Sequence, residues 1–450
     1  MIRTMHQSRS RTRTVSSRWH GIWPLVWPIM LSNLCVPLLG AVDTAILGHL
    51  DAPKYLGAVA VGASLLSLLY WSFGFLRMGT TSLVARAVGR NDTREATRLW
   101  LRAAALALTL AGGLLLLKPW LIGLGLYFMQ PAPEAAGLAA SYCAIRFLSA
   151  PASLLNYTLI GWFIGQQDTR RPLLLVITAN GVNLLLDVVF IIGLKMNSDG
   201  AAWASVIAEY CALAVGLVLL AGKIDRTHVK AHWHCCITNW SEYLPLLQVN
   251  RHLFVRTACL LGVFTFFTAQ GARMGTEIVA ANAILLQFVL LTSHALDGFA
   301  HAAEALCGKA VGARNRAEFI RVVQGTTALA LLTAAAISLL FWLGQHYWLS
   351  LFTALPEVLA QANRQFGWVV ILPLLTVWAY QLDGIFLGSG ATAAMQNIML
   401  VCTTAVFLPL WWFTQAQGNS GLWLAFCGFN LARSIAMALV YRAQQRRLSS

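Results

Sequence analysis

The chain is a succession of long apolar runs separated by short polar segments. A helix that crosses the hydrocarbon core of a bilayer needs about 20 mostly apolar residues. Hydrophobic residues make up 58% of the 450 residues and charged residues 11%, whereas a soluble domain carries about 25% charged residues. This composition excludes a secreted enzyme or a nucleic-acid-binding protein. The sequence predicts an all-α integral membrane protein.

Hydropathy and turn residues divide the chain into twelve predicted membrane spans. They begin near Ile22, Leu56, Arg98, Ala136, Pro172, Gly200, Tyr243, Val279, Glu318, Arg364, Thr392 and Gly421. An even number of spans leaves both ends of the chain on one side. The segments on that side hold 22 Lys and Arg residues, and the loops on the other side hold five. By the positive-inside rule, both termini are predicted to be cytoplasmic.

The two halves of the chain resemble each other at a fixed offset. Ala-Val-Gly at 87–89 returns at 310–312, and the Gly-x-x-x-Gly segment at 161–165 returns at 384–388, in both cases 223 residues later. Because each half has six spans, the halves share one orientation, and an axis along the membrane normal relates them around a central cleft. Two such lobes favour a transporter. The predicted organisation is a basic tail (1–21), an N-lobe (22–221), an inter-lobe loop (222–242), a C-lobe (243–441) and a second tail (442–450).

Eleven charged residues fall inside the predicted spans, where a lipid-facing charge costs at least about 2.5 to 3.5 kcal/mol. They are Asp43, Asp187, Glu209, Asp297, Glu304 and Asp383, with Arg77, Arg146, Arg251, Arg256 and Arg433. Three of them lie near cytoplasmic ends, where long side chains can reach the headgroups, namely Arg77, Arg251 and Glu304. Depth along the spans suggests two ion pairs, Arg146 with Glu209 and Arg256 with Asp297.

Asp43 and Asp187 both fall in the outer half of the bilayer, and no basic residue of the first half lies clearly beside them. Asn180, Asn183 and Asp187 share one helical face at i, i+3 and i+7. Two desolvated carboxylates that lie close together share a proton, so this pair is a candidate proton site. The alternative is that both carboxylates serve packing, through bonds to backbone and amide groups.

The second lobe lacks counterparts of these acids, because the residues 223 positions later are Phe266 and Leu410. It offers instead Asp297 and Asp383, each followed by glycine, either as a polar site for a cation or substrate or as a buried pair. In the first span, Pro28 removes a backbone hydrogen bond and lets the helix bend. The alternative is a proline that a membrane helix simply tolerates.

Motifs in both halves resemble those of the MATE (multidrug and toxic compound extrusion) transporters, and most of all their DinF branch. These motifs are PLLGAVDTAILGH at 37–49, YWSFGFLRMGT at 70–80, the Asn-x-x-Asn-x-x-x-Asp pattern that ends at Asp187, and LDGFAHAAE at 296–304. The resemblance covers essentially residues 22–441.

The resemblance implies twelve transmembrane helices in two six-helix lobes, in a multi-pass protein of the bacterial inner membrane that acts as a monomer. It implies export of small lipophilic, often cationic compounds by antiport against H⁺ or Na⁺, with membrane lipids as the surroundings and no further cofactor. Asp43 would be the coupling carboxylate and Pro28 the bending point. Its helpers would be Asp187, Asn180, Asn183 and, on the sixth span, Ser205.

Three other interpretations of the sequence are a flippase, a membrane-embedded enzyme and a metal-binding loop. A flippase for a lipid-linked or amphiphilic substrate would need a cationic cleft, and Arg146 and Arg256 are the mid-depth bases. A membrane-embedded enzyme would need a catalytic histidine and an acid paired at one membrane surface. His294 and His301 come nearest to such a pair, but they are better explained as ordinary buried histidines. We therefore predict that the protein is not an enzyme. In the inter-lobe loop, residues 232–236 carry two His and two Cys, which we interpret as a solvated linker because four ligands in five residues cannot readily close a zinc tetrahedron.

Overall fold

The computed structural model describes residues 22–48, 53–224, 239–353 and 355–447. Within these ranges the side chains of 36–48, 53, 240, 346 and 444–447 are not described. All secondary structure in the described ranges is helical, which confirms the predicted all-α fold.

The first half forms one set of helices, the N-lobe. It comprises α2 (Trp23–Gly48), α3 (Pro53–Ser72), α4 (Phe75–Gly89), α5 (Thr93–Met129), α6 (Pro133–Arg146), η1 (Phe147–Ser149), α7 (Ala150–Gly165), α8 (Arg170–Asp187), η2 (Val188–Gly193) and α9 (Asn197–Ala221).

The second half forms the C-lobe. It comprises η3 (Trp240–Tyr243), α11 (Leu244–Arg273), α12 (Thr276–Gly312), α13 (Arg316–Phe352), α14 (Pro356–Ser389), α15 (Thr392–Val401), η4 (Cys402–Phe407), α16 (Leu408–Thr414), η5 (Gln415–Gln417) and α17 (Asn419–Arg447).

The helices combine into membrane-length spans. Among the described residues, 11 spans are long and apolar enough to cross a bilayer, and α2, with 26 residues, is consistent with a twelfth. The predicted starts agree with these spans to within about five residues, except that α14 begins at Pro356 and not near Arg364.

The two lobes repeat the same turn chemistry 223 residues apart. Asp92 caps α5 by accepting a hydrogen bond from the Glu95 amide at 2.9 Å, and Asn315 caps α13 by accepting one from the Glu318 amide at 3.0 Å. A short polar side chain at the N-cap satisfies an amide that has no partner inside the helix. Both capped helices are 37 residues long, so the repeat extends from sequence to local geometry.

The lobes meet backbone to backbone at two repeat-related glycines. A Cβ atom on Gly89 would collide with the Lys309 carbonyl oxygen, and a Cβ atom on Gly312 would collide with the Arg86 carbonyl oxygen. Lys309 is itself the residue 223 positions after Arg86. Glycine permits this close approach because it has no side chain, so α4 and α12 touch in a reciprocal contact.

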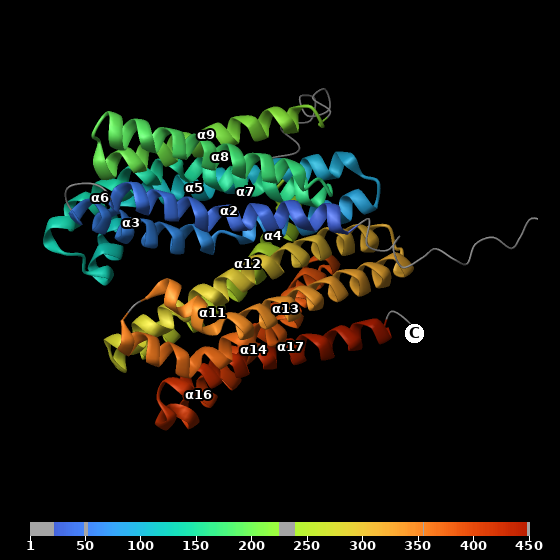
Figure 1. Ribbon diagram of the computed structural model, residues 1–450. Coiled ribbons are helices and arrows are strands. Elements are labelled where there is room, and N and C mark those ends of the chain that lie inside the picture. The colour runs from blue at the N-terminus through green and yellow to red at the C-terminus, as the bar shows by residue number, and fades with distance from the viewer. Residues whose placement is uncertain (1–21, 49–52, 225–238, 354, 448–450) are drawn as a thin grey trace, which may run out of the picture.

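Figure 1 shows the N-lobe (blue to green) and the C-lobe (yellow to red) side by side, with α4 and α12 on their facing sides. Side-chain hydrogen bonds join the lobes between the middle of α12 and the end that the positive charges predict to be cytoplasmic. They join Asn33 to the His294 carbonyl, Arg77 to His301, Ser82 to the Leu387 carbonyl and Lys309 to Gln167. In this conformation the lobes are therefore closed against each other at that end.

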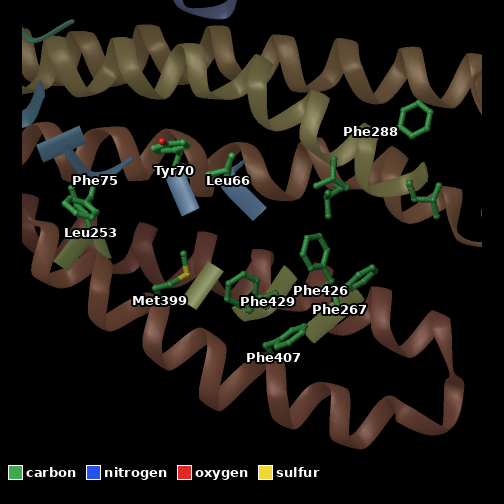
Figure 2. Packing of buried hydrophobic residues seen from close by; sticks show 14 of the residues in the cluster. Leu66, Tyr70, Phe75, Leu253, Phe267, Phe288, Met399, Phe407, Phe426 and Phe429 are labelled. Carbon is green, nitrogen blue, oxygen red and sulfur yellow. The ribbon is translucent and has the colours of Figure 1, made fainter. Parts of the chain in front are cut away.

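Aromatic packing forms the interior of the C-lobe. The Phe267 ring lies 5.0 Å from that of Trp423 and 5.3 Å from that of Phe426, centroid to centroid. Figure 2 shows Phe267 and Phe426 together with Phe429 and Phe407 in one cluster. Edge-to-face pairs of this kind add about 0.5 to 1.5 kcal/mol beyond the area they bury, and here they bind α11 to α17.

The reciprocal glycine contact makes a specific prediction for stability. We expect Gly312→Ala to lower the stability of the folded protein by about 1 to 3 kcal/mol, because the new methyl group overpacks a backbone contact that cannot yield. The measurement is the apparent melting temperature of the detergent-solubilised protein. Gly113→Ala is the matched control, since a Cβ atom there meets nothing within 4 Å. Equal melting temperatures for the two variants would contradict the close approach.

Candidate functional site

A polar cluster lies inside the N-lobe where α8 meets α9. Asp187 is 0% exposed and Asn183 is 1% exposed. In the amide orientation that satisfies its neighbours, Asn183 donates to Asp187 Oδ2 at 3.1 Å and accepts from the Ser205 amide at 3.2 Å and hydroxyl at 3.1 Å. The structure therefore brings together three of the predicted site residues. Asp187 ends α8 just before the π-helix η2, an irregularity that is frequent at functional sites.

Asn180, one turn before Asn183, faces α2 and not α9. Its side chain donates to the Cys35 carbonyl at 3.1 Å, and further down the same pair of helices Thr169 donates to the Pro24 carbonyl at 3.4 Å. Both contacts join residues 145 positions apart, so α2 and α8 run parallel in a constant register.

The same register, continued toward the helix ends, brings residue 42 of α2 level with Asp187, because both helices rise about 1.5 Å per residue. The backbone of Asp43 belongs to α2, but its side chain lies outside the described part of the chain. The structure thus gives the depth of Asp43 relative to Asp187 and leaves the contact between their carboxylates a prediction.

Pro28 is buried within α2, which continues through it as one helix. A proline has no amide to bond the carbonyl four residues earlier, and the Pro24 carbonyl accepts instead from the Thr169 hydroxyl at 3.4 Å. The Ser32 hydroxyl donates to the Pro28 carbonyl at 2.8 Å. Neighbouring side chains thus supply hydrogen bonds near this proline, while its role in bending stays a prediction.

A second buried cluster lies in the C-lobe, around Asp383 on α14. Asp383 Oδ2 accepts from Arg256 on α11 and from Arg433 on α17, the latter at 2.8 Å. Asp297 on α12 interacts electrostatically with both arginines and with Asp383. The structure therefore places the two predicted C-lobe acids in one cluster, although the hydrogen-bonding partner of Arg256 is Asp383 and not the predicted Asp297.

This cluster favours a buried ion pair over a cation site. Two guanidinium groups already neutralise the Asp383 carboxylate, and a further cation there would meet their positive charge. The sequence did not identify Arg433 as a partner, although an arginine within a span requires one. Arg433 lies on α17, far along the chain from Asp383, so the sequence did not indicate that the two residues pair.

The predicted ion pair between Arg146 and Glu209 is wrong as a direct contact. Glu209 accepts from the Asn156 side chain at 2.9 Å, and Arg146 donates to the Ser149 hydroxyl at 3.4 Å. The two charges still interact electrostatically. The Asn156 amide lies next to the Glu209 carboxylate and is its hydrogen-bonding partner. Depth alone had assigned that partner as Arg146.

The placement of Arg77 and Glu304 at the headgroups is also wrong. Arg77 of α4 contacts the His301 ring nitrogen Nδ1 at 3.2 Å across the lobe interface, and Glu304 is 0% exposed. Both side chains are held inside the protein because α4 and α12 pack directly against each other here. The His and Cys residues at 232–236 lie outside the described residues.

Comparisons with known proteins agree with the fold. The family model described as MatE matches residues 28–189 and 253–413. The chain is 38% identical over 433 residues to DNA damage-inducible protein F of Escherichia coli strain K12, covering 94% of this chain and 92% of that protein. It is 27% identical over 431 residues to Protein DETOXIFICATION 44, chloroplastic, of Arabidopsis thaliana, covering 93% and 81% of the two chains.

The fold also matches a structure described as the outward-facing conformation of a multidrug resistance MATE family transporter of the MOP superfamily. The TM-score is 0.83 at 20% identity, and the match covers 98% of this chain and 100% of that one.

The Asp383 cluster makes a stability prediction. We expect Asp383→Asn to destabilise the folded protein by about 3 to 5 kcal/mol, because it leaves Arg256 and Arg433 buried without a counter-charge. Asp168→Asn is the matched control. Asp168 also pairs with two cations, Lys223 at 2.8 Å and Arg171 at 3.0 Å, but its side chain is 23% exposed, and such a pair contributes about 0 to 1 kcal/mol. Thermal inactivation in detergent compares them, and similar losses in both variants would refute the difference.

Proposed function

The chain belongs to the MatE family, and from this premise we propose that it is a secondary active exporter of lipophilic, often cationic compounds that exchanges them for protons. The names of its relatives support export: one is a detoxification protein, and a structure of the same fold is described as a multidrug resistance transporter. The names of these relatives speak for a transporter and not for an enzyme.

The observation that carries the proposed coupling is the setting of Asp187. Its carboxylate is fully buried and takes a hydrogen bond from the neutral amide of Asn183. Asn183 is a neutral hydrogen-bonding partner of this carboxylate, and Asp383 is held by two arginines. An intramembrane acid in such a setting is suited to exchange a proton, and the register of α2 and α8 brings Asp43 to the same depth.

Proton and substrate would compete through charge. Ionised carboxylates in an inward-facing cleft favour a cationic substrate, and protonation from the outside weakens their attraction for it. The closure of the lobes at the predicted cytoplasmic end supports alternating access, because the described conformation would be one of the two end states. We further propose that the protein works as a monomer in the bacterial inner membrane with both termini in the cytoplasm, among lipids and without a nucleic-acid partner.

The arrangement of the arginines favours drug export over a flippase. A flippase for a lipid-linked pyrophosphate would need free cations in the cleft. Arg256 and Arg433, the buried arginines of the C-lobe, both bind Asp383. Both guanidinium groups are therefore already engaged by a carboxylate within the protein.

We expect Asp187→Asn to reduce proton-driven export at least about tenfold, because a neutral amide cannot take up the proton that displaces the substrate. Asp43→Asn should act in the same way. The measurement is ethidium or acriflavine transport in inverted membrane vesicles under an imposed ΔpH. Glu209→Gln is the control, since it replaces a half-buried carboxylate that an amide also holds. Undiminished coupled transport by a folded Asp187→Asn or Asp43→Asn variant would discard the assignment.

Imposing a pH gradient and a sodium gradient separately identifies the coupling ion. We expect a pH gradient to drive dye transport in vesicles and a sodium gradient at uniform pH to leave it unchanged. Carboxylate, amide and hydroxyl oxygens can also ligate Na⁺, so transport driven by sodium alone would replace the proton with sodium at the same residues. Translocation of a labelled lipid without dye transport would instead favour the flippase.

A further inference from the structure

Three polar side chains meet across the lobe interface on the side where the lobes are closed. Arg77 comes from α4 of the N-lobe, while His301 and Glu304 lie at i and i+3 on α12 of the C-lobe. Arg77 Nη1 lies 3.2 Å from His301 Nδ1, and the same Nδ1 lies 3.6 Å from Glu304 Oε2. One ring nitrogen therefore faces a cation of one lobe and an acid of the other.

Glu304 is the most completely enclosed member of this group. It is 0% exposed, and among the described residues neither of its carboxylate oxygens has a hydrogen-bond partner. An ionised carboxylate in such a place loses several kcal/mol of hydration. A proton on the carboxyl group removes that penalty and turns the group into a donor that can reach His301.

The nitrogen Nδ1 of His301 can accept a hydrogen bond from Arg77 or share a proton with Glu304, but it cannot do both at once. A guanidinium only donates hydrogen bonds, so Nδ1 accepts from Arg77 when it is unprotonated. With a proton shared between Nδ1 and Glu304, the lone pair that Arg77 uses is occupied. Binding of Arg77 and binding of a proton between His301 and Glu304 therefore exclude each other.

Other charged groups of the C-lobe lie around this pair. Arg256 of α11 acts electrostatically on both His301 and Glu304, but it is hydrogen-bonded to Asp383 of α14. Arg433 of α17 is held by the same carboxylate, and Asp297, one turn before His301 on α12, interacts electrostatically with these arginines and with Arg77. Within the described part of the chain, Arg77 is the member of this cluster that belongs to the N-lobe.

We propose that His301 and Glu304 form a proton-binding site at the lobe interface, and that Arg77 competes with the proton for His301. Proton uptake then releases Arg77 from α12 and favours separation of the lobes on the side that is closed here. Loss of the proton restores the contact. The site is separate from Asp187, and it does not depend on which ion drives transport.

The test measures the distance between the lobes as a function of pH. Nitroxide side chains replace Arg94 and Ala317, which are exposed and repeat-related near the starts of α5 and α13, through chemistry that does not use the native cysteines. Double electron–electron resonance in lipid nanodiscs, without substrate or gradient, follows the populations. We expect acidification to shift the wild-type population toward the longer inter-lobe distance.

Glu304→Gln should abolish this pH-dependent shift, because the amide cannot gain or lose the proton. Arg77→Gln should give the longer distance at every pH, and because Arg77 is half-buried this variant gives a second reading if Glu304→Gln fails to fold. Glu209→Gln should keep the wild-type shift. A wild-type protein without any shift, or an unchanged shift in Glu304→Gln or Arg77→Gln, would overturn the proposal, as would its loss in Glu209→Gln.

Failure of this site and failure of the proposed transport function are distinguishable. The distance measurement contains neither dye nor ion gradient, so a protein that exports nothing could still show the pH-dependent shift. Conversely, proton-driven export that depends on Asp187 could occur in a protein whose inter-lobe distance ignores Glu304.

Discussion

Polar groups inside a membrane must find their partners within the protein, because hydrocarbon offers none. This constraint explains most of the buried charges here. Asp383 draws arginines from two helices, Glu209 takes the amide of Asn156, and the carbonyl that Pro28 leaves without its usual donor takes the hydroxyl of Thr169. Each partner comes from a different helix, so satisfying the polar groups also fixes how the helices are arranged. Glu304 departs from this pattern in its hydrogen bonds and lies where the two lobes must part.

The repeat supplies a symmetric frame that carries asymmetric chemistry. Gly89 and Gly312 make reciprocal contacts with the opposite backbone, and the caps at Asp92 and Asn315 match. At the positions of Asp43 and Asp187, however, the C-lobe has Phe266 and Leu410, and the Phe266 ring packs 5.5 Å from that of Phe407 and 6.3 Å from that of Trp411. An aromatic cluster thus takes the place of the polar one. Only one lobe keeps acids at these repeat positions, so the proposed coupling site has no counterpart in the C-lobe.

The sequence predicted the fold because hydropathy and the repeat act along the chain, where they can be read directly. It also placed Asn183 and Asp187 on one helical face, and the structure brings their side chains into contact. Ser205 came only from the family resemblance. It failed for Arg256 and for Glu209, because depth along a span fixes one coordinate, while the rotation of each helix decides which side chain it meets. The predicted placement of Arg77 and Glu304 at the headgroups was wrong for another reason. Their spans end near the membrane surface, but tight packing of α4 on α12 removes that surface from reach.

The contacts of α2 connect the site in the N-lobe to the lobe interface. On one side, α2 is tied to α8 at Pro24 and Cys35; on the other, Asn33 donates to the His294 carbonyl of α12, and Met30 packs against Gly298. Because α2 also carries Asp43 at the depth of Asp187, a change of charge there acts on a helix that both lobes hold. A shift of α2 along α8 would strain its contacts with α12, and separation of the lobes would pull α2 away from one of its two partners. Under the proposed coupling, protonation inside one lobe would act on movement between the lobes through the packing of this single helix.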